Sequence, residues 1–257
     1  MTRRRAALAC LALVSGTVSC IDVSVDPHAI SAIEFVATTN PSVVTGDTLR
    51  DTLGVAEVLR AQVYGGDGER LPDVPVSFVT TDTFATIANG NLLVARSGVR
   101  GTAKVYAVAG GLQSLVRNVE VIPRPDSIAP NGAATDTVSY RLPATGTSID
   151  SSTTVGFIVR AGQGVVNAVR VKFEIVRGGT VLGPGDTTTY SLVGPQGRAS
   201  AVDTTDGQGI VSRTLRVRTV AGTVIRDTIV VRANATIGGA ALKGAPARVT
   251  IVVIPAP

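Results

Sequence analysis

Apolar and polar residues alternate along much of this chain, most regularly at residues 168–176. Successive side chains of a β-strand point to opposite faces, so a period of two predicts a strand with one buried face. We expect an apolar face inside and a charged face in water. The inward set is Val169, Val171, Phe173 and Ile175, and the outward set is Ala168, Arg170, Lys172 and Glu174. A shift of one residue would bury those charges, so the pairing register is strongly specified.

The same period recurs in segments that turn-forming residues divide. Further strands are expected at residues 58–64, 74–80, 102–108, 115–122, 210–220, 224–233 and 248–254. The chain contains 28 glycines and 13 prolines, and the Asp67-Gly68 and Asp206-Gly207 pairs are typical of tight turns. Short strands at this spacing predict an antiparallel β-sandwich. Residues 49–63 are the single weak helix candidate.

Residues 123–126, Pro-Arg-Pro-Asp, separate two series of predicted strands. Proline lacks a backbone donor and restricts the preceding residue, so two prolines within three residues end a strand and stiffen a connection. We therefore expect an all-β protein with two tandem sandwiches, at residues 30–123 and 124–257. The second exceeds the usual length, and we expect long loops at residues 131–137 and 178–197.

The first twenty residues have the pattern of an export signal. Three arginines, Arg3 to Arg5, precede an apolar run at residues 6–14, and small residues lead to Cys20. That run is shorter than the roughly 20 residues of a membrane-spanning helix. We predict a cleaved signal peptide at residues 1–19 and a short tether at residues 20–29.

Two interpretations of Cys20 are open. Val18 and Ser19 resemble the lipobox of bacterial lipoproteins, which implies lipidation of Cys20 and anchoring to the cell envelope, at the outer membrane or cell surface. Ordinary cleavage beside Cys20 is the alternative. A free thiol is reactive in an oxidising compartment, which favours lipidation. Cys10 leaves with the signal, so the mature chain contains no disulfide within itself.

Charge and residue usage exclude several functions. The formal charge of +5 includes three arginines of the signal, and without them 21 basic and 19 acidic residues remain. Nucleic-acid binding needs a concentrated basic face and is not expected. His28 is the only histidine and lies in the tether. The folded part therefore lacks the base of a catalytic triad and the usual zinc ligands. We expect no enzyme activity and no cofactor.

Two pairs of residues are weak candidates for binding. Asp203 and Asp206 offer the hard oxygen ligands that calcium prefers, although Asp206 is also a favourable turn residue. Tyr64 and Tyr106 are expected on outer faces, where exposed aromatic rings can stack on a sugar. Scattered surface tyrosines are equally consistent with an ordinary surface.

The first half resembles bacterial immunoglobulin-like domains of the group-2 type. The similar segments are residues 61–64 (Ala-Gln-Val-Tyr), 72–78 (Pro-Asp-Val-Pro-Val-Ser-Phe), 84–87 (Phe-Ala-Thr-Ile), 89–92 (Asn-Gly-Asn-Leu) and 101–107 (Gly-Thr-Ala-Lys-Val-Tyr-Ala). The second half is similar to the group-1 type of invasin- and intimin-like surface proteins. It shares residues 169–173 (Val-Arg-Val-Lys-Phe), 178–179 (Gly-Gly) and 205–210 (Thr-Asp-Gly-Gln-Gly-Ile). The resemblance implies two immunoglobulin-like sandwiches that serve as extracellular spacers or adhesive modules, without shared catalytic residues.

The expected function is that of a non-catalytic, lipid-anchored structural spacer or adhesive module. Its expected partners are the membrane, through the N-terminal lipid, and a surface protein or glycan. A glycan-binding module is the alternative, and a hydrolase or hydrolase accessory protein is a third. The histidine-free core argues against a hydrolase.

Overall fold

The computed structural model describes residues 29–183 and 188–257. The predicted signal peptide, Cys20, His28 and nearly all of the expected tether lie outside the described residues. The described part consists of strands, turns and connections. It contains no helix that is long and apolar enough to cross a membrane.

Nine strands precede the Pro-Arg-Pro-Asp segment. They are β1 (Ile30–Phe35), β2 (Ser42–Val44), β3 (Ala61–Gly65), β4 (Ser77–Thr80), β5 (Ala85–Ala88), β6 (Leu92–Ala95), β7 (Gly101–Ala109), β8 (Leu112–Gln113) and β9 (Arg117–Ile122). One sheet has the order β2-β9-β7-β4, and the other side is formed by the pairs β1-β3 and β5-β6. An isolated bridge between Val58 and Leu92 joins these two pairs.

The remaining strands follow residue 126. They are β10 (Ser127–Pro130), β11 (Thr135–Tyr140), β12 (Ser148–Ala161), β13 (Gly164–Val165), β14 (Arg170–Arg177), β15 (Thr180–Leu182), β16 (Tyr190–Val193), β17 (Val202–Thr204), β18 (Ile210–Val220), β19 (Asp227–Asn234), β20 (Thr236–Ile237), β21 (Ala240–Ala241) and β22 (Ala247–Pro255). Two facing sheets have the orders β10-β12-β18-β16 and β11-β22-β19-β14-β15, and the short hairpin β20-β21 stands apart.

Both sets have the strand order of an immunoglobulin-like sandwich. In the second, the first strand is divided: β10 pairs with β12 in one sheet, and β11 pairs with the last strand, β22, in the other. The first set repeats this division, because β1 pairs with β3 while β2 pairs with the last strand, β9. The pairs β2-β9 and β11-β22 are parallel, and the other named strand pairs are antiparallel. The all-β fold predicted from the sequence is therefore confirmed.

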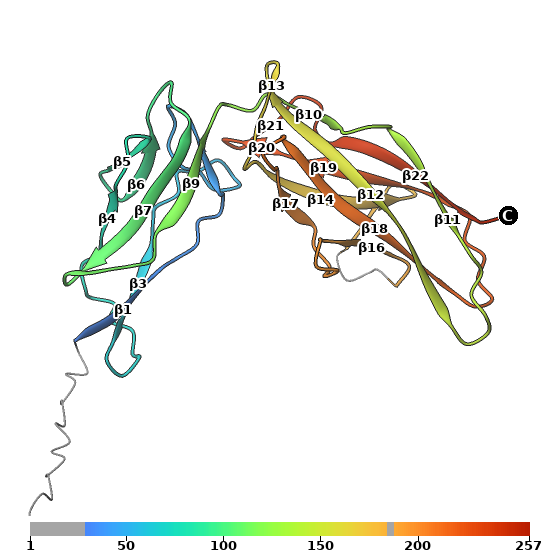
Figure 1. Cartoon of the computed structure of the whole chain (residues 1–257), viewed down its shortest axis with the longest axis horizontal. Coiled ribbons are helices and arrows are strands. Elements are labelled where there is room, and N and C mark those ends of the chain that lie inside the picture. The colour runs from blue at the N-terminus through green and yellow to red at the C-terminus, as the bar shows by residue number, and fades with distance from the viewer. Residues whose placement is uncertain (1–28, 184–187) are drawn as a thin grey trace, which may run out of the picture.

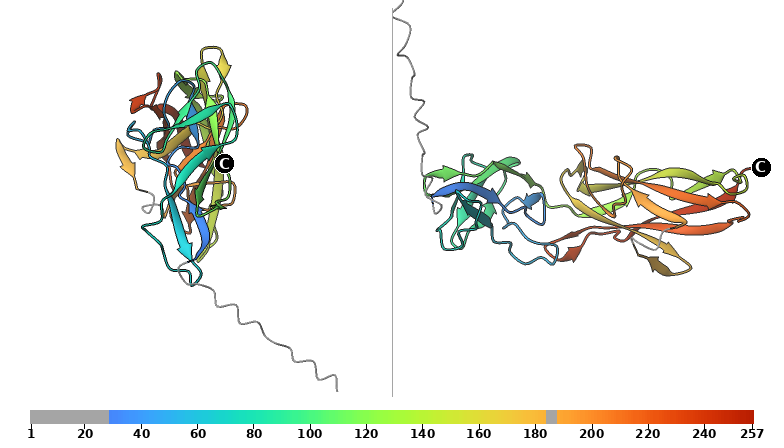
Figure 2. Two further views of the ribbon diagram at one scale, coloured as in Figure 1. Left: turned by 90° about the vertical axis from the view of Figure 1, so that its left-hand side faces the viewer. Right: turned by 90° about the horizontal axis from the view of Figure 1, so that it is seen from below.

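Each sandwich encloses apolar side chains from both of its sheets. In the first, Phe35 of β1 meets Phe78 of β4 edge to face, with ring centroids 5.4 Å apart. In the second, Phe157 of β12 meets Phe173 of β14 in the same way at 5.7 Å. Figures 1 and 2 show the two sandwiches end to end, with β9 leading into β10.

For the strands with the clearest alternation, the sequence correctly predicted which side chains face the core. Val169, Val171, Phe173 and Ile175 are buried, and so are Ala103, Val105 and Ala107 of β7. Other expectations were wrong. Ala168 was expected on the outward face but is buried in the second core. Residues 49–63 form no helix and instead enter β-bridges and β3. The expected loop at 131–137 contains part of β11, and the expected loop at 178–197 contains all of β15 and β16.

The turn after Asp206 also differs from the expectation. Gly209, not Gly207, has the left-handed conformation, with φ +70°. A Cβ atom on Gly209 would lie 2.8 Å from the carbonyl oxygen of Val159. Glycine is therefore required here both for the backbone angle and for the close approach of β12.

Candidate functional site

The two sandwiches meet in a region that contains hydrogen bonds, an ion pair and buried apolar side chains. We call this region the joint. Residues 123–126 connect β9 to β10. Both the backbone N–H and the backbone carbonyl of Asp126 are hydrogen-bonded to the second sandwich. Its N–H donates to the Arg160 carbonyl at 2.9 Å, and its carbonyl accepts from Lys243 N–H at 2.9 Å. Its carboxylate also accepts from Gly162 N–H at 2.5 Å. These bonds fix the connection to the second sandwich.

Apolar and polar contacts cross the joint away from the connection. Val44 and Ile122 belong to strands of the first sandwich but are buried in the hydrophobic cluster of the second. The Ser42 hydroxyl donates to the Ala168 carbonyl at 2.7 Å. The Arg170 guanidinium donates to the Thr39 carbonyl at the same distance. The joint is thus a packed and hydrogen-bonded contact, in contrast to a free linker.

A glycine contact adds a third point of attachment. Gly54 of the first sandwich lies against the Gly238-Gly239 turn between β20 and β21. A Cβ atom on Gly54 would lie 2.4 Å from the backbone of Gly238. Gly54 and Gly239 both have φ values in the left-handed region, +85° and +80°. Only glycine allows two backbones to approach so closely in this conformation.

Asp47 is a charged residue at the joint whose carboxylate has several partners. Its carboxylate pairs with Arg50 at 3.0 Å and with Arg124 of the connection at 3.3 Å. It also accepts from Thr48 N–H at 2.7 Å. Burial by itself raises the pKa of Asp47, but the hydrogen bonds from Arg50 and Thr48 and the two positive charges outweigh burial. The pKa of Asp47 therefore lies below its ordinary value of 3.8.

This lowered pKa predicts how the joint responds to acid. A carboxyl group with a depressed pKa in the folded state stabilises that state above its unfolded pKa, and the contribution is lost as pH falls through the folded pKa. We expect the carboxyl carbon of Asp47 to titrate below 3.8 in an NMR pH series. Arg50→Ala should raise that midpoint. A midpoint above 3.8 in the unmodified protein would contradict the arrangement.

The two calcium candidates are engaged by the protein itself. Asp203 lies on β17 and forms an ion pair with Arg213 of β18. Asp206 lies in the following turn, where its Oδ1 accepts from Gln208 N–H and Ile210 N–H at 2.9 Å each. Within residues 29–183 and 188–257, no group of three or more metal-ligating side chains comes together.

Arg213 was not singled out in the sequence, although it lies in the strand expected at residues 210–220. Its side chain is only 5% exposed. It contacts the Asp203 carboxylate and the Val202 carbonyl, donates to the Ser200 carbonyl at 3.2 Å, and lies 5.9 Å from the Phe173 ring centre. Arg213 thus joins the two sheets of the second sandwich from the inside.

Tyr64 and Tyr106 lie on different sheets of the first sandwich. Tyr64 belongs to β3, next to buried Val63, and Tyr106 belongs to β7, between buried Val105 and Ala107. Each faces away from the shared core, so the two rings point to opposite sides. The Tyr64 hydroxyl lies 3.0 Å from the Glu34 carboxylate, a hydrogen bond that raises the pKa of Tyr64. The structure does not bring the two rings together into one stacking surface.

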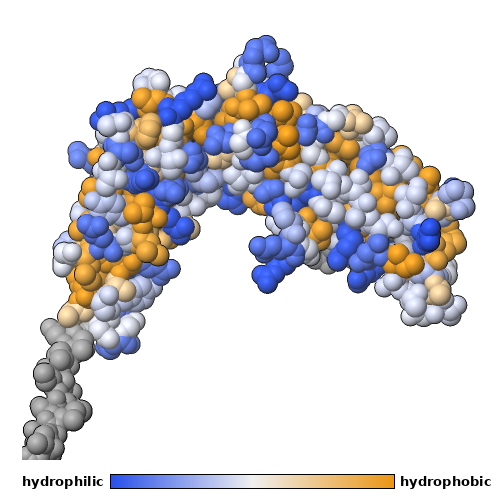
Figure 3. Space-filling view, in the orientation of Figure 1, coloured by the Kyte–Doolittle hydropathy of each residue, from blue (hydrophilic) through white to orange (hydrophobic). Residues whose placement is uncertain are grey.

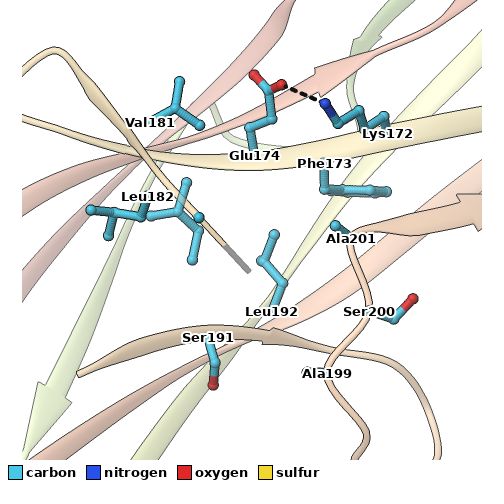
Figure 4. Close-up of a pocket in the computed structure, with 12 residues that line it drawn as sticks. Lys172, Phe173, Glu174, Val181, Leu182, Ser191, Leu192, Ala199, Ser200 and Ala201 are labelled. Carbon is cyan, nitrogen blue, oxygen red and sulfur yellow. Dashed lines mark ion pairs between the residues drawn. The ribbon is translucent and has the colours of Figure 1, made fainter. Parts of the chain in front are cut away.

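A small pocket opens at the edge of the second sandwich between β14, β15 and β16 (Figure 4). Its volume is about 230 Å³, below the usual range for small-molecule sites. Phe173, Leu182 and Leu192 supply much of its apolar lining. Its charged side chains, Lys172 and Glu174, pair with each other at 3.2 Å. The pocket therefore presents few free polar groups to orient a ligand.

Comparison with known proteins gives no family assignment. No protein family matches the sequence, and no curated protein matches it. Among solved structures, the chain is similar to domains 4 and 5 of the S-layer protein SbsC, with 14% identity, a TM-score of 0.32, and coverage of 88% of this chain and 98% of that one. It is also similar to the Yersinia pseudotuberculosis adhesin InvE, with 15% identity, a TM-score of 0.33, and coverage of 87% and 60%. The D0-D1 domain of intimin matches with 15% identity, a TM-score of 0.25, and coverage of 86% and 95%. At these TM-scores the similarities support no conclusion about function.

Proposed function

We propose that this chain is a non-catalytic cell-envelope protein, anchored through a lipid on Cys20, that acts as a structural spacer or adhesive module. The observation that carries the spacer role is the joint. A spacer must hold its far end at a defined distance and direction, and a packed contact between two sandwiches does this where a free linker cannot. The export signal and Cys20 in the sequence support the anchor.

The organisation of the chain also suits the display of a binding surface. The predicted tether enters at β1, and β22 ends at the opposite end of the second sandwich (Figure 1). Connections at that far end would be held away from the envelope, where a surface protein could reach them. Binding residues in sandwich proteins are commonly carried by such connections.

The anchor is tested by mass spectrometry of the mature N-terminus. We expect acyl chains on Cys20 and recovery of the protein with membranes. Cys20→Ser should release it into the soluble fraction, because stable attachment needs two or more acyl chains. An unmodified cysteine, or cleavage elsewhere, would contradict the anchor.

The spacer role is tested through the joint. With Cys20 replaced by serine, spin labels at Thr86 and Arg248, which are exposed on the two sandwiches, should give a narrow distribution of distances. The double variant Ser42→Ala and Arg170→Ala removes two hydrogen bonds across the joint and should broaden it. Arg218→Ala is the control, because it removes an exposed ion pair with Asp150 inside the second sandwich. A broad distribution in the unmodified protein would contradict a rigid spacer.

A further inference from the structure

The hairpin tip of the first sandwich exposes large apolar side chains. β7 continues into β8 through Gly110 and Gly111, and the chain then returns as β9. On this return, Leu115 is 88% exposed and Val116 is 55% exposed, and Leu112 of β8 is 39% exposed. Large apolar side chains that gather at one exposed tip indicate an interaction surface. We name Leu112, Leu115 and Val116 the hairpin-tip patch.

A β-bulge holds the patch in place. Val108 pairs with Gln113 and Val105 pairs with Arg117, so the two residues between them on β7 oppose three on the returning strand. Ser114 fills the bulge and is buried. Its N–H donates to the Ala107 carbonyl at 2.9 Å, and its hydroxyl accepts from Ala107 N–H at 2.9 Å and donates to the Leu115 carbonyl at 3.0 Å. A bulge re-aims the side chains beside it, and here the residues that follow Ser114 are exposed.

The patch lies where the N-terminal segment enters the fold. β9 leads from this tip to the joint, so the tip is at the end of the first sandwich away from the second (Figure 1). A Cβ atom on Gly110 would lie 2.4 Å from Cδ1 of Ile30, the first residue of β1. Figure 3 shows hydrophobic surface in orange at this end, next to the grey N-terminal segment.

Chain length then places the patch near the anchor. Ile30 lies ten positions after Cys20, and a fully extended chain over that separation reaches about 35 Å at most. Attachment at Cys20 makes contact with the membrane intramolecular, so a weak surface is sufficient to dock. Between Ala107 and Val119 the only charged residue is Arg117, a cation that anionic headgroups attract.

We propose that the hairpin-tip patch docks on the lipid surface to which Cys20 is attached. This rests on the proposed lipid anchor and adds that the first sandwich contacts the membrane. Leu115 and Val116 enter the interface between headgroups and acyl chains, and Arg117 lies among the phosphates. The two contacts, lipid on Cys20 and docked tip, then set the direction in which the second sandwich points.

The chain offers a clean reporter, because it contains no tryptophan and its mature form has one cysteine. The mature protein is coupled through Cys20 to a maleimide-headgroup lipid in vesicles of phosphatidylcholine and phosphatidylglycerol with brominated acyl chains. With Leu115→Trp, we expect bromine to quench the fluorescence. Val224→Trp is the matched control, because Val224 is 59% exposed but belongs to the second sandwich, and it should keep its fluorescence. No quenching at position 115, or equal quenching at both positions, would overturn the proposal.

A second measurement avoids the added aromatic ring. In the tethered chain with its native tip, amide hydrogen exchange at residues 112–117 should slow about tenfold relative to the free protein. The double variant Leu115→Ser and Val116→Ser should abolish that slowing. Protection that appears without vesicles and rises with protein concentration would assign the patch to a second copy and overturn lipid docking.

The two proposals fail separately in these experiments. Coupling through the maleimide lipid supplies the anchor in vitro, so docking can be measured whatever cells attach to Cys20. If Cys20 is unmodified in cells but the tip docks in vitro, only the proposed lipid anchor is contradicted. If Cys20 is lipidated in cells but the tip does not dock in vitro, the hairpin-tip proposal is contradicted and the lipid anchor is supported.

Discussion

Replacement of Phe173 by alanine is expected to lower the free energy of unfolding of the second sandwich by about 3–5 kcal/mol. The side chain is 1% exposed, and its ring contacts Phe157 of the facing sheet edge to face, at a centroid distance of 5.7 Å. Truncation loses the transfer free energy of the ring and leaves a cavity between the two sheets, which β12 and β14 cannot close because each is held in its own sheet. The ring also lies beside the guanidinium of buried Arg213, so its removal also takes away this cation–π contact.

Urea unfolding measures this change, and a neighbouring position supplies the control. Val181 lies on β15, which pairs with β14, but it is 46% exposed. Val181→Ala should therefore change the free energy of unfolding by at most about 0.5 kcal/mol. A Phe173→Ala protein with unfolding midpoints equal to those of the control would show that the ring is not part of the core.

Arg213→Ala is expected to cost about 3 kcal/mol, near the lower end of the range for breaking a buried ion pair. The Arg213 side chain is 5% exposed, but Asp203 is 31% exposed and regains water when its partner is lost. The carbonyl of Ser200 also loses the guanidinium as its donor, and the carbonyl of Val202 keeps only the Ser200 hydroxyl. Those carbonyls lie beside or within β17, so we expect β17 to detach from β14 before the rest of the sandwich unfolds.

An exposed arginine on the same strand is the comparison for this loss. Arg218 pairs with Asp150 at 2.9 Å and is 48% exposed, so Arg218→Ala should cost about 0–1 kcal/mol. Hydrogen exchange at residues 202–204 should rise in the Arg213 variant and not in the Arg218 variant. Equal stabilities of the two variants would show that Arg213 is not a structural link between the sheets.

Strands with one apolar and one charged face could be predicted from the sequence. Strands whose two faces are similar in polarity could not. β14 alternates apolar and charged residues, and each predicted side chain lies on its expected face. β12 was missed, although it is 14 residues long. Its first half, Ser-Ile-Asp-Ser-Ser-Thr-Thr, is mostly exposed and lies beyond the segment, Phe157 to Arg160, that pairs with β10. A polar strand of this kind has no period to detect.

The contacts at the joint could not be predicted from patterns of neighbouring residues in the sequence. Ser42 and Ala168 are 126 positions apart, and Thr39 and Arg170 are 131 apart, so only the assembled fold brings them together. Arg213 was different, because its position was visible. It has the same parity as Val211, Leu215 and Val217, which are buried, so the alternation within the expected strand was enough to place it inside.

The parallel pairs β2-β9 and β11-β22 determine how the protein would carry tension. In each sandwich, the second part of the divided first strand lies beside the last strand and runs in the same direction. A pull between the two termini would slide these neighbours past each other lengthwise. All the bonds between them would then share the load at once, whereas a hairpin pulled at its open end yields one bond at a time. With the proposed anchor at one end and a partner bound at the other, the protein would resist extension along the line of the pull.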